Sequence, residues 1–226
     1  MKPIIHSLDN LKVGLFVELV RLFESYGHKL YMVGGTVRDY LMGSSLTDMD
    51  LVTDATPSEM KSFIPEADYT FEKYGSVKLK YQKIKFDITT LRKEKGYLDS
   101  RHPNEIVFTK SLEEDVKRRD FTLNALYMDK DFKVIDYVGG EKDLENKILR
   151  VVGNSDIRIK EDPLRIIRAF RFQINYGFIL DKELEEAINN NLYLLQKLNK
   201  EKIKQEIEKC LDKEKLIECL KHLNVL

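Results

Sequence analysis

Residues 34–57 read GGTVRDYLMGSSLTDMDLVTDATP, and this stretch decides the fold of the first part of the chain. Its double glycine separates residues 29–33, which have the composition of a short strand, from residues 36–42, which have that of a short helix. Asp48 and Asp50 then lead into an apolar run of β-forming residues. The order strand, glycine turn, helix and strand predicts a domain that combines a sheet with helices.

The acidic pair is the first candidate for chemistry. Alternate residues of a strand share a face, so Asp48 and Asp50 are expected to project from the same side. Two carboxylates that close repel each other, and divalent cations stabilise such a pair; oxygen ligands of this kind suit Mg²⁺. An Asp-x-Asp pattern alone is more often an ordinary polar turn. The surrounding sequence must therefore distinguish a metal-binding pair from such a turn.

Those neighbours favour a phosphate site. The glycines Gly34 and Gly35 let a backbone approach a phosphate closely, although a Gly-Gly turn followed by surface ions at Arg38 and Asp39 is the alternative. Apolar and charged residues alternate from Val77 to Ile88 and predict a hairpin that carries Asp87 on its polar face. Asp87 would lie beside Asp50 as a base or metal ligand near an attacking hydroxyl; otherwise it is a solvated strand residue.

The composition of the chain limits the number of domains and argues against a zinc-binding or membrane-spanning protein. The chain has 226 residues, 42% of them apolar, which suits one large domain or two small ones. Lys plus Arg and Asp plus Glu are equal at 38 each, so net charge indicates no partner, although residues 117–119 form a local basic cluster. Cys210 and Cys219 match no zinc spacing, and no apolar run reaches the roughly 18 residues of a membrane span. We expect a soluble, unprocessed, cytoplasmic protein.

Periodicity predicts a change of architecture along the chain. Residues 10–26 have the spacing of an amphipathic helix. From about Pro163 onward the apolar spacing is helical throughout, including a face that ends at Leu211. We therefore predict an α+β head at residues 1–152, with a small mixed sheet, and an all-helical domain at 153–226.

Five ordered motifs give the chain a family resemblance. The stretch 34–57 resembles the first signature of class II tRNA nucleotidyltransferases (CCA-adding enzymes) and bacterial poly(A) polymerases, which have a polymerase β-like head followed by a helical neck. The further matches, in order, are FDITTLRKEKGYLDSRHPNEIVF at 86–108, EEDVKRRDFTLNALYMD at 113–129, DYVGGEKDLENKILRVVG at 136–153 and EDPLRIIRAFRF at 161–172. A weaker match at 198–211 has Lys202 where the family usually has Arg.

The resemblance implies a role for each motif in the head. Asp48 and Asp50 would hold metal ions. Residues 92–105 resemble a flexible loop that assists the switch from C to A addition. The remaining implied roles are contacts to the triphosphate, by Gly34, Gly35 and Arg38, and to the nucleotide, by Arg118, Asp120 and Asn124. Taken alone, residues 117–121 would be interpreted as a solvated basic patch.

The resemblance also implies a protein template for the base. Asp162 and Arg165 are neighbours on a helix face, and as structure alone they would be a cap and a surface ion pair. Cytosine and adenine both place an amino donor beside a ring-nitrogen acceptor, which an aspartate and an arginine can match together, whereas uracil and guanine present the reverse pattern. Arg168, at the next step along the helix, would brace Arg165 or contact phosphate.

The implied activity is transfer of CMP and AMP from CTP and ATP to the 3′ end of tRNA, with Mg²⁺ as cofactor and pyrophosphate released. Alternatives within the family are a poly(A) polymerase and an enzyme that adds only A. From another class, the alternative is an inactive RNA-binding relative. Family members usually continue into body and tail domains, and the sequence ends at Leu226. We therefore also expect a minimal enzyme, a homo-oligomer or an RNA-binding partner subunit.

Overall fold

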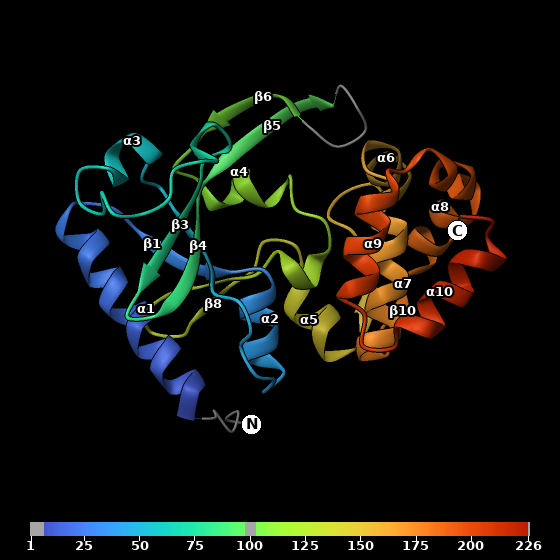
Figure 1. The fold of residues 1–226 in the computed structure, drawn as a ribbon, viewed down its shortest axis with the longest axis horizontal. Coiled ribbons are helices and arrows are strands. Elements are labelled where there is room, and N and C mark those ends of the chain that lie inside the picture. Colours follow the sequence, from blue (N-terminus) through green and yellow to red (C-terminus); the bar gives the residue numbers. More distant parts are fainter. Residues whose placement is uncertain (1–6, 98–102, 226) are drawn as a thin grey trace. The chain divides into compact units, whose positions relative to one another are not determined.

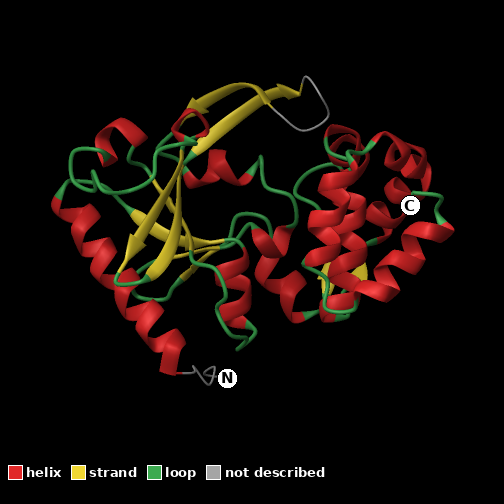
Figure 2. Ribbon diagram, in the orientation of Figure 1, coloured by secondary structure: helices red, strands yellow, loops and turns green. Residues whose placement is uncertain are grey.

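The computed structural model describes residues 7–97 and 103–225. By its internal contacts the chain divides into two compact units. Unit 1 contains residues 1–95, 105–119 and 124–140, and unit 2 contains residues 96–104, 120–123 and 141–226. Figure 1 and Figure 2 show the elements of both. The predicted boundary between a head ending at residue 152 and a neck beginning at residue 153 stays a prediction.

The helices and strands up to the end of unit 1 alternate closely along the chain. They are α1 Ser7–Ser25, β1 Leu30–Val33, α2 Gly35–Leu41, β2 Asp50–Thr53, α3 Pro57–Met60, η1 Glu72–Tyr74, β3 Ser76–Tyr81, β4 Ile84–Thr90, β5 Arg92–Tyr97, β6 Pro103–Phe108, α4 Leu112–Val116, η2 Thr122–Asn124, β7 Tyr127–Met128 and β8 Val134–Ile135. The predicted helix, strand and helix at residues 10–26, 29–33 and 36–42 are confirmed to within a few residues.

The sheet of unit 1 is mixed and has the strand order β3-β4-β2-β1-β7-β8. β2 and β4 run parallel, while β3 pairs with β4 and β1 pairs with β2 in antiparallel fashion. One face of the β3–β4 hairpin is apolar and buried, at Val77, Leu79, Phe86 and Ile88, because those side chains alternate with charged ones. The predicted hairpin and the α+β fold class with a small mixed sheet are confirmed.

Helix α1 fixes the loop that leads into β2. Asp9 is buried on this helix, and its carboxylate accepts a hydrogen bond from Leu46 N at 3.0 Å. The buried Lys12 ammonium donates to the carbonyl oxygens of Leu46 and Thr47. A buried charge needs such partners, so both residues tie the segment before Asp48 to the helix.

Unit 2 is mainly helical, as expected. Its elements are α5 Gly140–Glu145, β9 Ile148–Leu149, α6 Ser155–Glu161, α7 Leu164–Tyr176, β10 Ile179–Leu180, α8 Lys182–Asn191, η3 Leu192–Lys197, α9 Lys200–Glu208 and α10 Lys213–His222. Its core joins the apolar faces of these helices to Phe121, Leu123 and Val151. The expected helical position of Leu211 is wrong, because α9 ends at Glu208 and Leu211 is 80% exposed.

Within the described residues, no helix has both the length and the apolar composition that crossing a membrane requires.

Candidate active site

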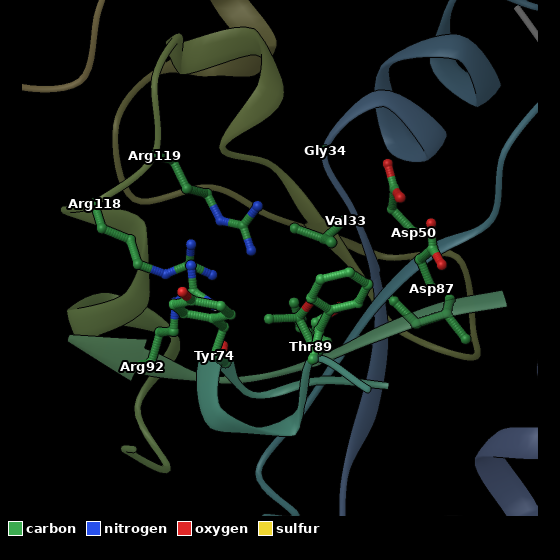
Figure 3. A pocket seen from close by; sticks show the side chains of 13 residues that line it. Val33, Gly34, Asp50, Tyr74, Asp87, Thr89, Arg92, Arg118 and Arg119 are labelled. Atoms are coloured by element: carbon green, nitrogen blue, oxygen red, sulfur yellow. The ribbon is translucent and has the colours of Figure 1, made fainter. Parts of the chain in front are cut away.

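A pocket of about 420 Å³ opens in unit 1 over strands β2 and β4 (Figure 3). Four of the residues singled out from the sequence line it, namely Gly34, Asp50, Asp87 and Arg118. The other lining residues include Phe71 and Tyr74, which the sequence did not single out, and Arg92 and Arg119, which it indicated only as members of the loop at 92–105 and of the basic cluster at 117–119. The pocket therefore brings together acidic, basic and aromatic side chains from segments far apart in the sequence.

Strand register places two carboxylates side by side. Asp50 and Asp87 are register partners on the parallel strands β2 and β4, as expected for a third carboxylate beside the pair. Asp87 N also donates to Met49 O at 2.9 Å. Asp48 lies in the loop before β2, because the strand begins at Asp50, so the two aspartates do not share a strand.

Thr36 connects the acidic segment to helix α2. Its buried hydroxyl donates to Asp48 O at 3.1 Å and accepts from Asp50 N at 2.8 Å. One hydroxyl thus satisfies a backbone donor and a backbone acceptor of the same segment. The backbone from Asp48 to Asp50 is therefore held by the Thr36 hydroxyl and by the hydrogen bond from Asp87 N to Met49 O.

Burial and the neighbouring negative charges disfavour the ionised form of Asp50. Burial and the negative charges of Asp87 and Asp48 together raise the pKa of Asp50 to about 6, against the lowering effect of Arg119 and Arg38. A bound divalent cation would offset this repulsion, and carboxylate oxygens suit Mg²⁺. No three His, Cys, Asp or Glu side chains of the described residues converge as a complete metal site. As hard oxygen donors, the carboxylates of Asp48 and Asp50 have the chemistry that such a cation would need, and substrate phosphates and water would have to supply further ligands.

The glycine turn approaches the same carboxylate. Gly34 has φ +65°, and a Cβ placed on it would lie 4.0 Å from Asp50 Oδ2. A side chain would fill the space in front of Asp50 and strain the backbone, so glycine fits here for two reasons. Behind the turn, Arg38 is buried and its Nη1 donates to Asn124 Oδ1 at 2.6 Å.

An arginine wall, made by Arg92, Arg118 and Arg119, faces the carboxylates across the pocket (Figure 3). It is anchored by Asp115, which is fully buried. The Asp115 carboxylate accepts hydrogen bonds from Arg118 Nε at 2.8 Å, from Arg119 Nη2 at 2.8 Å and from Arg92 N at 3.1 Å. Burial alone would raise the pKa of Asp115, but the two guanidinium groups and these bonds lower it to about 2.

The wall argues against the alternative interpretation of residues 117–121 as a solvated basic patch. Arg118 and Arg119 have side chains only 15% and 12% exposed. The signal was present in the sequence, because Asp115 precedes these arginines by three and four residues, the spacing of neighbours on a helical turn. Phe71 and Tyr74 had no comparable signal, since tertiary folding alone brings them to the pocket.

The other predicted residues gather around α7 in unit 2. Arg168 Nη2 forms an ion pair with Asp120 Oδ2, and Asp120 Oδ1 accepts from Phe121 N at 2.7 Å. Asp162 accepts from Leu164 N at 3.1 Å. Arg165 is buried and its Nη1 donates to the carbonyl oxygen of Arg158. Asp162 and Arg165 are therefore both held by backbone contacts around the start of α7, while Arg168 contacts Asp120.

Two further motif segments, residues 92–105 and the segment that contains Lys202, place no additional described side chain in the pocket beyond that of Arg92. Strands β5 and β6 pair with each other and flank residues 98–102, so the centre of the loop expected at 92–105 lies outside the described residues. Lys202 lies in the first turn of α9, where its backbone N–H donates to Asn199 O at 3.0 Å.

Comparison with known proteins identifies the family. The family model described as the poly A polymerase head domain matches residues 30–150. The chain belongs to this family. The resemblance drawn from the sequence motifs is thereby confirmed, and the matched segment contains Asp48, Asp50, Asp87 and the arginine wall.

Relatives share about 40% of aligned residues. The chain is 40% identical over 193 residues to the CCA-adding enzyme of Bacillus subtilis (strain 168), which covers 85% of this chain and 49% of that enzyme. It is 43% identical over 205 residues to the CCA-adding enzyme of Lactobacillus gasseri, covering 91% and 51%. The chain thus spans about half the length of the curated relatives it matches.

Solved structures agree with this assignment. The Bacillus stearothermophilus CCA-adding enzyme in complex with CTP matches with a TM-score of 0.78 and 35% identity, covering 85% of this chain and 47% of that one. The Thermotoga maritima CCA-adding enzyme complexed with tRNA matches with a TM-score of 0.74 and 26% identity, covering 94% and 50%. The expected fold of a nucleotidyltransferase head with a helical domain is confirmed.

Proposed function

We propose that the chain is a tRNA nucleotidyltransferase that adds C and A to the 3′ end of tRNA from CTP and ATP and releases pyrophosphate. The observation that carries this proposal is the register pairing of Asp50 with Asp87, in a pocket whose opposite wall presents three arginines. Relatives named as CCA-adding enzymes, and solved relatives bound to CTP or tRNA, support it.

Asp48 and Asp50 would hold Mg²⁺, which supplies activation of the attacking hydroxyl and charge neutralisation on the triphosphate. Asp87 lies beside Asp50 and would accept the proton of the RNA 3′ hydroxyl or hold that hydroxyl in place. The guanidinium groups of the arginine wall would bind phosphate oxygens, because planar arginine donors match such oxygens in pairs. Gly34 and Gly35 would admit the triphosphate to the backbone, with Arg38 and Asn124 supporting the turn from behind.

Base selection is proposed for unit 2. Asp162 would accept from the exocyclic amino group of cytosine or adenine, and Arg165 would donate to the adjacent ring nitrogen. Asp162 Oδ1 already accepts from Leu164 N, which fixes the orientation of the carboxylate. The ion pair of Arg168 with Asp120 would brace the same helix. This arrangement would exclude uracil and guanine, whose donors and acceptors are reversed at these positions.

The test is incorporation of labelled CTP and ATP, with Mg²⁺, into tRNA transcripts that lack part or all of CCA, followed by sequencing of the product ends. Ends that stop at CCA support the proposal. Runs of A would instead identify a poly(A) polymerase, addition of A alone an A-adding enzyme, and no incorporation an inactive relative.

Variants at the acidic pair test the assignment of residues. We expect Asp48→Ala and Asp50→Ala to eliminate incorporation while the thermal unfolding temperature stays within a few degrees, because these carboxylates serve the cation and not the core. Asp87→Asn should lower kcat with little change in KM for CTP, since its partner is the RNA hydroxyl. The control is Asp131→Ala, an exposed aspartate of a turn in the same unit. Activity retained in Asp50→Ala would contradict the assignment.

A further inference from the structure

Phe71 lines the pocket but has no part in the proposed chemistry. It is 48% exposed, and no described residue gives its ring an aromatic or cationic partner. Single exposed apolar side chains are common on protein surfaces, so exposure alone indicates nothing. An exposed ring inside a concave site lined by carboxylates and guanidinium groups is a different case, because such a site is built for a charged ligand with a planar part.

The backbone that carries Phe71 is fixed. The carbonyl oxygen of Phe71 accepts hydrogen bonds from Tyr74 N at 3.0 Å and from Ser76 N at 3.3 Å. Gly75 closes the turn with φ +76°, and its carbonyl oxygen accepts from Thr90 N at 2.8 Å. A ring presented on a fixed turn loses little conformational freedom when a partner stacks on it, so binding costs less.

Tyr74 is the other aromatic residue that lines the pocket, and a lysine ammonium group already covers one face of its ring. The ammonium group of Lys73 lies over this ring, 4.8 Å from its centroid. Figure 3 also places Tyr74 close to Arg92 and Arg118 in the arginine wall. Phe71 is therefore the better candidate for stacking on a ligand.

The order of the strands indicates which nucleotide Phe71 meets. Across the sheet the order runs from β1, which ends at the glycine turn, through β2 with Asp50 and β4 with Asp87 to β3, just after Phe71 in the chain. In an in-line displacement the attacking and leaving oxygens lie on opposite sides of the phosphorus. With the leaving pyrophosphate at the glycine turn, the attacking RNA end approaches from the β4 and β3 side.

We propose that Phe71 is a stacking platform for the nucleobase of the terminal RNA nucleotide, the one that carries the attacking 3′ hydroxyl. The direction from which the RNA approaches rests on the proposed function. The stacking platform itself rests on the exposed ring of Phe71 and on the hydrogen-bonded turn that carries it. Every base has a π-face, so such a platform accepts any terminal nucleotide and would serve successive additions to a growing end.

Fluorescence tests occupancy without requiring catalysis. The chain contains no tryptophan, so F71W introduces a single indole into the pocket. We expect saturable quenching of F71W when a short RNA ending in CC is titrated, and little change with CTP or ATP alone. The matched control is Y137W, because Tyr137 belongs to the same unit, is also 48% exposed and does not line the pocket.

Kinetics tests the contribution to binding. We expect F71A to raise KM for RNA roughly 5- to 100-fold, with kcat and KM for CTP little changed, and F71Y and F71W to retain near-normal values. An unchanged KM for RNA in F71A overturns the proposal. Quenching of F71W by CTP or ATP without RNA overturns the assignment to the RNA end. A protein that binds RNA through F71W yet incorporates no nucleotide supports the platform and contradicts the proposed activity.

Discussion

A few side chains with two or more partners set the geometry of this site. Thr36 joins both ends of the Asp48–Asp50 segment through one hydroxyl, and Asp115 holds two arginines and a strand backbone through one carboxylate. Neither residue needs to touch a substrate to matter. Loss of either would release the carboxylate segment or the arginines that line the pocket, so substitutions here should affect both stability and the shape of the pocket.

Asp115 gives a testable dependence of stability on pH. Its pKa of about 2 in the folded chain lies below the ordinary value of 3.8, so the unfolded chain binds the proton more tightly. The stabilisation is therefore present above about pH 4 and is lost as pH falls through about 2, a total of roughly 2 kcal/mol. Urea unfolding at about pH 5 and about pH 3 should show wild type losing about 1 kcal/mol more than Asp115→Asn. Equal losses would contradict the folded-state pKa.

The proposed template role of Asp162 and Arg165 makes a prediction about nucleotide selectivity. We expect Asp162→Ala and Arg165→Ala to erode the preference for CTP and ATP over UTP and GTP by roughly one to two decades, because each removes a hydrogen bond worth about 1 to 3 kcal/mol in discrimination. The measurement is kcat/KM for all four nucleotides. Lys160→Ala is the control, since this exposed lysine of α6 pairs with Asp156 instead. Equal loss for all four nucleotides would mean that the pair is structural.

At the scale of single elements, the turn from η1 into β3 depends on Gly75. Its φ of +76° is unfavourable for other residues, and a Cβ would lie 2.8 Å from Phe108 Cε1. Gly27 after α1 has a similar φ of +81° but open space around it. We expect Gly75→Ala to lower the free energy of unfolding by about 1 to 3 kcal/mol more than Gly27→Ala, the difference being the clash.

The double variant Gly75→Ala with Phe108→Ala checks this explanation, because removal of the ring should recover most of that difference in a double-mutant cycle. Additive effects would show that Phe108 is not the obstacle.

Elements with a local sequence pattern could be predicted from the sequence. Features that depend on contacts between residues far apart in the chain could not. The β3–β4 hairpin and α1 follow from alternation and helical spacing, and the hairpin in turn places Asp87 where Asp50 can pair with it. Leu211 continues a helical spacing, yet the helix ends before it. The bond between Arg38 and Asn124 joins residues 86 positions apart, and no periodicity indicates such a pair.

At the scale of the whole chain, the helical core of the second unit includes residues that precede residue 153. Phe121, Leu123, Leu149 and Val151 are all buried in its core. Thr122 N donates to Arg150 O at 2.9 Å, and Val152 N donates to Asp120 O at 2.8 Å. A cut after residue 152 would remove these contacts together, although the sequence alone favours a boundary there.

We therefore expect the fragment 153–226 to lack a cooperative thermal transition by circular dichroism, while the fragment 119–226 keeps one. Burial of a large apolar side chain contributes about 1.5 to 3 kcal/mol, so four such losses amount to roughly 6 to 12 kcal/mol. That is as large as the whole stability of an ordinary domain, about 5 to 15 kcal/mol. A cooperative transition in 153–226 at the temperature seen for 119–226 would instead support the boundary at residue 153 and show that Phe121 and its neighbours contribute little to the helical core.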